Sequence, residues 1–195
     1  MIFHKINEFL IKCIVNDSAE SNLEQVVKHN LSNPGREAYE FLVISAPSYD
    51  ISSTKTVNTS CQNLIKIAED TLSSNNNLKK VIIMEHLPRF DNKLNSNLAK
   101  LANTTLSKLW EDSCFKDKIV IGKHLLFDYG VGKTHNSRYG NLETGKYDGI
   151  HLYGPSEAWE YTKNLNNILS SAIQRNDQNS HIHQNRYSTL SEGNF

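Results

Sequence analysis

The sequence predicts a three-layer α/β domain built around a mainly parallel sheet. Short apolar runs rich in β-branched residues alternate with stretches whose apolar residues recur every three or four positions. Strands that alternate with helices are joined by crossover connections, which favours parallel pairing with helices on both faces of the sheet. Polar residues follow several of the strand-like runs, and this is where open α/β sheets bind their ligands.

The first half of the chain contains two strand-like runs and two helical stripes. Residues 9–15 (FLIKCIV) form the first predicted strand, and the apolar residues of 23–31 repeat at helical spacing behind it. Residues 41–44 (FLVI) form the next strand. Ser60 is predicted to cap the second helix because a serine side chain can accept from free backbone N–H groups. The expected inner face of that helix is Cys61, Leu64, Ile65, Ala68 and Leu72.

The alternation continues in the second half. Residues 79–84 (KKVIIM) and 118–122 (KIVIG) are predicted strands, and a helix over 98–110 lies between them. Its expected apolar stripe is Leu98, Leu101, Ala102, Thr105, Leu106 and Leu109, with Trp110 at its end. An irregular, glycine-bearing stretch over 123–147 leads to a last helix over 158–172.

Length and composition indicate one domain and exclude several classes of protein. The chain has 195 residues, and we expect residues 1–173 to form a single domain and residues 174–195, which lack apolar periodicity, to form a disordered tail. Lys plus Arg equals Asp plus Glu, 21 each, so the formal net charge is zero. A neutral chain is a poor match for a nucleic acid backbone or an anionic membrane surface, and we expect neither partner.

The N-terminus and the cysteines favour an intracellular protein. Charged residues interrupt the apolar residues of 1–15, so this segment lacks the core of a signal peptide, and no stretch is long enough to span a bilayer. The three cysteines are far apart in the sequence and odd in number, which suits a reducing compartment.

Candidate site residues follow the predicted strands. Asp50 comes after the FLVI strand, His86 and Arg89 come after VIIM, and His124 comes after IVIG. The carboxyl ends of parallel strands meet at one edge of a sheet, so we expect these residues to line a common cleft. For His86 and Arg89 an alternative is structural, with the strand ended by Pro88 and the arginine paired with an acidic neighbour. We expect His124 to form part of the cleft wall rather than to act as a base.

The spacing of Asp148 and His151, just before the last helix, points to acid–base chemistry. An acidic residue three positions before a histidine can fix the orientation of the imidazole, and Gly149 allows a tight turn between them. The other ring nitrogen can then accept a proton from a serine nucleophile. The alternative is an ordinary pair of loop residues.

We expect no metal and no cofactor. The histidines near the strand ends lack the spacing of zinc sites, and the His181 and His183 pair falls in the predicted tail. Gly132-Lys133-Thr134 resembles the end of a phosphate-binding loop, but the glycine that the motif needs five residues earlier is Phe127.

Several segments, in order, resemble the SGNH (GDSL-type) hydrolase superfamily. The segment DGIHLYG (residues 148–154) is similar to its last conserved block, which carries a D-x-x-H motif, and FLVISAPSYD (residues 41–50) is similar to its third block, in which a strand opens into a G-x-N-D turn. The similarity covers roughly residues 20–172 and is closest to SGNH-like animal proteins often associated with mobile elements. The segments that carry it are GRE-x-x-x-FLVISAP-x-x-DI, SCQNLIKIAEDTL, LKKVIIMEH-x-PRFD, NLAKLANTTLSKLW, KDKIVIGKH and RYGNLETGKYDGIHLYG.

The resemblance implies a flavodoxin-like α/β/α fold and hydrolysis of a small ester through an acyl-serine, without metal or cofactor. Asp148 and His151 match the acid–base pair. Asp50 matches the acidic residue of the third block, but Tyr49 stands where the family has the asparagine of its oxyanion hole.

The nucleophile has two candidate positions. Ser18, in the Asp17-Ser18 pair after FLIKCIV, resembles the family's G-D-S block. Residues 18–41 leave room for only one helix, however, and this spacing favours FLIKCIV as the second strand of the family, with the first strand and its serine before Met1. The exposed sheet edge would then favour self-association. Two functions follow: an ester hydrolase, or a non-catalytic binding module that keeps the fold without the reaction.

Overall fold

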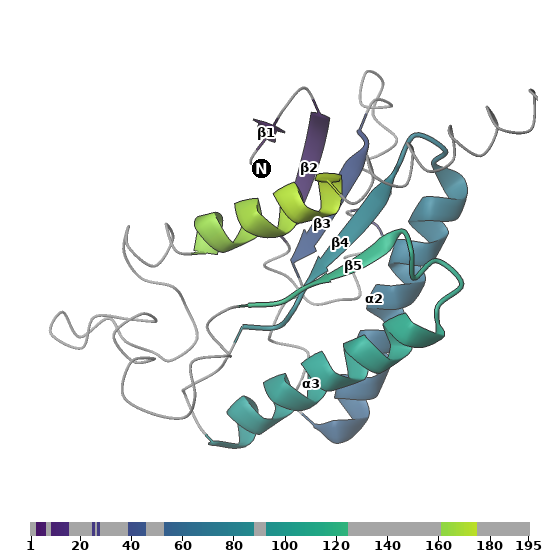
Figure 1. The fold of residues 1–195 in the computed structure, drawn as a ribbon. Coiled ribbons are helices and arrows are strands. Elements are labelled where there is room, and N and C mark those ends of the chain that lie inside the picture. The colour runs from purple at the N-terminus through teal and green to yellow at the C-terminus, as the bar shows by residue number, and fades with distance from the viewer. Residues whose placement is uncertain are drawn as a thin grey trace, which may run out of the picture.

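A computed structural model describes residues 3–6, 9–15, 25, 27, 39–45, 53–87, 93–124 and 161–174. The described strands form one five-stranded sheet in the order β1-β2-β3-β4-β5 (Figure 1). β1 pairs with β2 in antiparallel fashion, and all the other pairs are parallel. The strands are β1 (Phe3–Ile6), β2 (Phe9–Val15), β3 (Phe41–Ser45), β4 (Lys80–Met84) and β5 (Ile119–Gly122). The predicted α/β fold with a mainly parallel sheet is confirmed.

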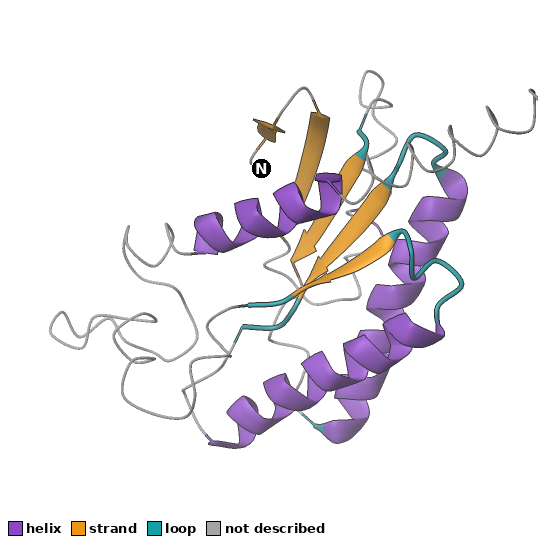
Figure 2. Cartoon of the chain, viewed as in Figure 1, coloured by secondary structure: helices purple, strands orange, loops and turns teal. Residues whose placement is uncertain are grey.

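Helices cover both faces of the sheet (Figure 2). α2 (Thr54–Ser74) and α3 (Lys93–Asp112) pack against each other on one face. The helix over residues 161–174, called the C-terminal helix below, lies on the other face. None of the described helices combines the length and the apolar composition that a membrane span requires.

The central strands are apolar on both faces because both faces are covered. In β3, Leu42 and Ile44 pack with α2 and α3, whereas Phe41 and Val43 pack with the C-terminal helix. The same alternation of period two separates the side chains of β4 into these two cores. This accounts for the continuous runs FLVI and VIIM, which the sequence correctly identified as buried strands.

α2 begins earlier than the sequence predicted. Its N-cap is Ser53, whose side chain accepts from the Thr56 N–H, while the Thr56 hydroxyl oxygen accepts from the Ser53 N–H. Ser60, the predicted cap, lies inside the helix and is buried. The predicted inner face is confirmed, and the Cys61 thiol contacts the Ala102 carbonyl oxygen of α3 at 3.4 Å.

α3 follows its predicted stripe in part, and Ala99, which was not predicted, is also buried. Leu101, expected in the core, is 37% exposed, and the polar Asn103, two positions later, is buried instead. Leu98, Ala102 and Leu106 are buried as predicted. The buried face of α3 therefore includes Asn103 instead of Leu101. Asn103 is buried because its side-chain amide bonds to the backbone of His86, as described below.

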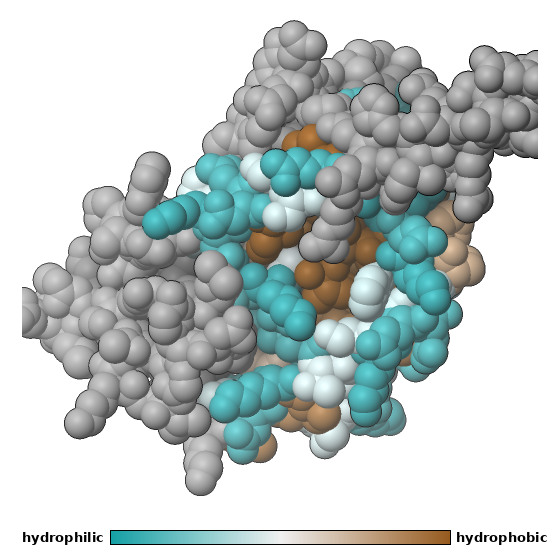
Figure 3. Space-filling model, in the orientation of Figure 1, coloured by the Kyte–Doolittle hydropathy of each residue, from teal (hydrophilic) through white to brown (hydrophobic). Residues whose placement is uncertain are grey.

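The segment after α3 is attached to β5. The Trp110 indole N–H donates to the carbonyl oxygens of Lys116 and Ile119, at 3.1 and 2.8 Å, and the Ile119 N–H donates to the Phe115 carbonyl oxygen. The next side chains of β5, Val120 and Ile121, are partly buried. Apolar atoms are visible in Figure 3 where Figure 1 draws β5, between the C-terminal helix and α3.

An edge position of residues 9–15 would have favoured the truncation hypothesis, but β1 pairs with the outer side of β2, so β2 is not an edge of the described sheet. In a flavodoxin-like sheet of order 2-1-3-4-5, the strand beside the third is the first. β2 lies beside β3, so it occupies the place that this order gives to the first strand rather than to the second. A further strand encoded before Met1 stays a prediction.

The parallel register brings the carboxyl ends of four strands level. Val15 pairs with Ser45, Ser45 with Met84, and Met84 with Gly122. Gly122 suits this end because a Cβ there would lie 2.6 Å from the Met84 sulfur and 3.4 Å from the Ile168 side chain. The absence of a side chain leaves room for the Met84 side chain of the neighbouring strand where β5 ends.

Candidate functional site at the carboxyl end of the sheet

The aligned carboxyl ends are the common origin of the segments with predicted site residues. Of those residues the structure describes His86, two positions after β4, and His124, two positions after β5. The other predicted site residues lie outside the described residues: Ser18, Tyr49, Asp50, Arg89, Asp148 and His151. The same holds for most of residues 123–147 and for the predicted tail, so the expected assembly of Asp148, His151 and Ser18 stays a prediction.

His86 is held by its backbone. Its N–H donates to Asn103 Oδ1 at 2.8 Å, and Asn103 Nδ2 donates to the His86 carbonyl oxygen at 3.1 Å. Both partners are buried, so the amide of Asn103 satisfies two backbone groups that water does not reach. α3 therefore fixes the path of the chain immediately after β4.

Glu85 joins the ends of β4 and β5. Its N–H donates to the Gly122 carbonyl oxygen at 3.0 Å, which extends the ladder by one residue. Its carboxyl oxygen Oε2 accepts from the His124 N–H at 3.2 Å. Glu85 is buried, and this contact holds its carboxyl group over the start of the segment that follows β5.

His124 lies between β5 and the C-terminal helix. It is 2% exposed, and its ring faces that of Tyr161 with centroids 5.3 Å apart and planes tilted by 33°. The Tyr161 hydroxyl lies 3.3 Å from Ser45 Oγ at the end of β3. In the same helix, Asn164 donates through Nδ2 to the Lys123 carbonyl oxygen at 3.1 Å. The C-terminal helix thus connects the ends of β3 and β5.

Burial keeps His124 neutral. Desolvation lowers the pKa of His124 to about 4 from 6.5, and a hydrogen bond with the Glu85 backbone opposes this effect. The Glu85 N–H already donates to Gly122, so the group available to the ring is the Glu85 carbonyl oxygen, which only accepts. The ring nitrogen Nε2 is buried without a hydrogen-bond partner, so Nδ1 is the nitrogen that donates. Nε2 is consequently the unprotonated nitrogen and carries a lone pair.

These residues define a carboxyl-end cluster: Ser45, Glu85, His86, His124 and Tyr161. Sequence reasoning selected its two histidines and missed its other three members, and it also missed Asn103 and Asn164, which bond to the backbone beside the cluster. Asn103 and Asn164 carried a readable signal, because each is a polar residue within an apolar helical stripe. Glu85 directly follows a buried strand, which was a second signal. Ser45 and Tyr161 carried none, since their contact depends on how the C-terminal helix packs.

The arrangement provides hydrogen-bond acceptors rather than a metal centre or a strong base. Within the described ranges, His, Cys, Asp and Glu side chains do not gather in groups of three or more suited to a metal ion. At neutral pH a histidine with a pKa of about 4 stays unprotonated and is a weak base. Its Nε2 is best suited to accept a hydrogen bond from a neutral donor.

Comparison with known proteins finds similarity to solved structures and none to protein families or curated proteins. No known protein family matches the chain, and no curated protein matches it. Among solved structures, the chain is similar to a GDSL-like lipase from Bacteroides thetaiotaomicron, with 17% sequence identity, a TM-score of 0.48, and coverage of 77% of this chain and 70% of that chain.

Proposed function

We propose that the protein is an ester hydrolase of the SGNH (GDSL) type whose site lies at the carboxyl end of the sheet. His151 is the general base, Asp148 orients it, and Ser18 is the nucleophile. The support comes from the D-x-x-H spacing before the last helix, from the ordered segments that resemble this superfamily, and from the parallel α/β arrangement. An association with mobile elements stays a prediction from the same segments.

The place of β2 beside β3 is the observation that carries the proposal. In a flavodoxin-like sheet, ligands bind at the carboxyl end between the first and third strands, where the strand order reverses. β2 and β3 are the two strands in that position, and Val15 at the end of β2 is level with Ser45 at the end of β3. Ser18 follows β2 by three residues in the chain. This favours Ser18 over a serine encoded before Met1.

The proposed reaction is acyl transfer through serine. The Ser18 hydroxyl oxygen attacks the carbonyl carbon of the ester as His151 takes its proton, and the alcohol leaves as this proton is returned to it. Water then attacks the acyl-serine by the same route, releasing the acid. Tyr49 takes the place of the oxyanion asparagine, and its hydroxyl is the donor that we assign to the developing negative charge. Asp50, His86 and Arg89 line the cleft.

A non-catalytic binding module is the second candidate function. The departure at Tyr49 favours it, because a tyrosine hydroxyl donates from a different position than an asparagine amide. Loss of one oxyanion donor costs on the order of 10²–10³ in kcat. Such a protein would keep the cleft and bind the ester without cleaving it.

Hydrolysis of p-nitrophenyl acetate by the full chain tests the proposal. We expect the wild type to hydrolyse this ester. His151→Ala and Ser18→Ala should each lower kcat by about a million-fold, as removal of a triad residue does in other serine hydrolases. Matched controls are His181→Ala, in the predicted tail, and Ser73→Ala, at an exposed position of α2; both should leave the rate unchanged.

Covalent labelling provides a second readout. A fluorophosphonate should phosphonylate Ser18 with loss of fluoride, and mass spectrometry of the Ser18 peptide detects the adduct. Turnover that persists in Ser18→Ala, or labelling of another serine, would remove Ser18 from the mechanism. Absence of both turnover and labelling would leave the binding module as the function.

A further inference from the structure

We propose that His124 is a specificity-determining residue whose Nε2 accepts a hydrogen bond from a hydroxyl group of the ligand. This inference rests on the proposed function, since it takes the ligand to be the ester substrate. It assigns to the site a preference for esters that carry a free hydroxyl group.

The first step is the unsatisfied nitrogen. Nε2 of His124 is buried and makes no hydrogen bond, while the residue as a whole is 2% exposed. A buried acceptor without a partner has lost its hydrogen bonds to water and gained none in return, so such groups are rare in folded proteins. The cost is recovered when a donor arrives, and a bound ligand is one source of such a donor.

The second step is the location. His124 follows β5 by two residues at the end of the sheet where parallel α/β proteins bind their ligands. Glu85 fixes the backbone of His124, and Tyr161 packs against its ring. The ring is therefore held from two sides, and a preorganised acceptor discriminates among ligands better than a mobile one.

The third step is the chemistry of the donor. The Glu85 carbonyl oxygen fixes the tautomer with the proton on Nδ1, so Nε2 presents a lone pair and no proton. A lone pair repels carboxylate and phosphate oxygens. A neutral hydroxyl donates to Nε2 without bringing a charge into a buried place, which favours it over an anion.

Two esters that differ by one group test the proposal: 2-hydroxyethyl acetate and propyl acetate, in which a methyl replaces the hydroxyl. We expect the wild type to hydrolyse the hydroxylated ester with about tenfold higher kcat/KM, because propyl acetate leaves Nε2 unpaired. His124→Phe keeps a ring against Tyr161 and removes the lone pair, so the ratio should fall to about one. His181→Phe, in the predicted tail, is the matched control and should keep the wild-type ratio. A wild-type ratio near one, or a ratio that survives in His124→Phe, would overturn the proposal.

A binding measurement separates this proposal from the proposed function and does not depend on how well His124→Phe folds. In the Ser18→Ala chain, 2-hydroxyethyl acetate should shift the ¹⁵N resonance of His124 Nε2 towards that of a hydrogen-bonded nitrogen, and propyl acetate should not. Such a shift in a chain whose wild type is inactive supports the role of His124 and rejects hydrolysis. Equal responses to the two esters in an active enzyme reject the role of His124 and leave hydrolysis standing.

Discussion

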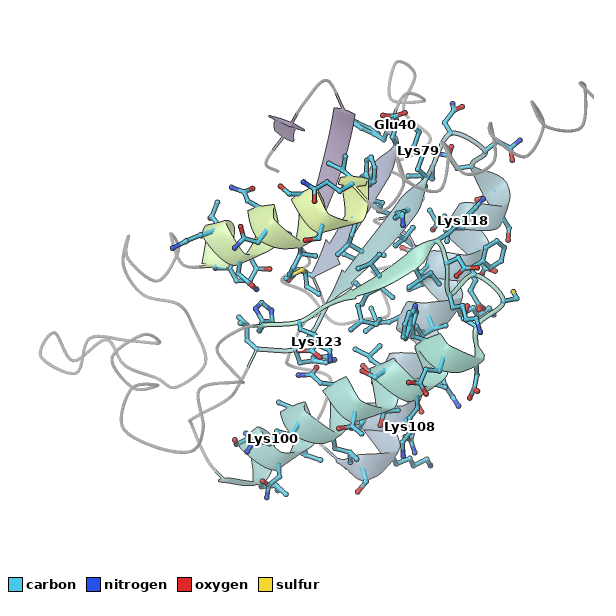
Figure 4. The ribbon with its side chains drawn as sticks, viewed as in Figure 1. Glu40, Lys79, Lys100, Lys108, Lys118 and Lys123 are labelled. Carbon is cyan, nitrogen blue, oxygen red and sulfur yellow. The ribbon has the colours of Figure 1, made fainter. Side chains whose placement is uncertain are left out.

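The two ends of the sheet hold polar groups in opposite ways. At the amino end, Glu40 and Lys79 form an ion pair whose side chains are 28% and 39% exposed, and the Glu40 carbonyl oxygen accepts from the N–H groups of Lys79 and Lys80. At the carboxyl end, Glu85 and His124 are buried. Figure 4 shows Glu40 and Lys79 together at one end of the sheet and Lys123, next to His124 in the chain, at the other.

The two ends differ in how much water reaches their polar groups, and this decides how much each group costs the folded state. An exposed pair remains partly hydrated and contributes little to stability. A buried polar group has lost its water and is costly unless it is paired. The described part of the carboxyl end nevertheless contains three buried polar residues in two short segments, Glu85, His86 and His124. The buried Lys80 at the amino end is the first residue of β4. The comparison therefore supports the proposed site at the carboxyl end, on grounds independent of motif resemblance.

Asn103→Ala should have the largest effect on this comparison. The variant removes the Asn103 amide that the buried His86 N–H and carbonyl oxygen bond to, at about 2 kcal/mol for each group, or about 4 kcal/mol of unfolding free energy in total. Urea denaturation measures it. Asn97→Ala on the exposed face of the same helix is the control and should change stability by less than about 0.5 kcal/mol. Equal effects of the two variants would contradict the buried clamp.

The pH dependence of stability should reveal the neutral state of His124. Its pKa falls from 6.5 to about 4 on folding, so between these values the unfolded chain binds more protons than the folded one. Stability is then complete above pH 6.5 and decreases as the pH falls towards 4, by roughly 3 kcal/mol for this residue.

His124→Phe isolates this contribution. The difference in unfolding free energy between wild type and variant should change by roughly 3 kcal/mol in favour of the variant between pH 7 and pH 4. Denaturation curves of both proteins at each pH provide the measurement. His181→Phe, in the predicted tail, is the control and shows how much the loss of any histidine changes the pH dependence of stability. A difference that stays constant across this range would show that His124 titrates normally.

Glu40→Gln should have the smallest effect. The ion pair with Lys79 is partly exposed, so we expect a loss below about 1 kcal/mol that shrinks further as salt is added. Denaturation at low and high ionic strength checks both statements. A loss comparable to that of Asn103→Ala would erase the contrast between the two ends of the sheet.

The sequence predicted the parts of the fold that local pattern determines. β3 and β4 are continuous apolar runs because helices cover both of their faces, and that pattern is readable without a structure. The start of α2 was placed at Ser60, the serine directly before the apolar stripe, and only the reciprocal contacts of Ser53 and Thr56 identify the cap. β1 was missed because it is four residues long, and its pairing with β2 defines it.

The site was predicted less completely than the fold. The positions of His86 and His124 after their strands were correct, since chain order alone places them at the carboxyl end. The burial of His124 and its pairing with Tyr161 were not predictable, because they depend on a helix 37 positions later in the chain. The prediction placed Leu101 in the core instead of Asn103, because hydrophobicity alone favours leucine at an inward position.

The indole of Trp110 also affects whether a strand of another molecule can pair with the edge of this sheet. β5 ends the described sheet, and its outward backbone groups are those of Ile119 and Ile121, because Lys118 and Gly122 bond inward to β4. Trp110 and the Phe115 carbonyl occupy both outward groups of Ile119. Within the described residues of β5, Ile121 alone keeps its outward backbone groups for an incoming strand, which is too short a stretch to template a cross-β ladder. The tryptophan thus occupies part of the edge that an incoming strand would have to use, and edge strands in other proteins are often blocked by charged residues instead.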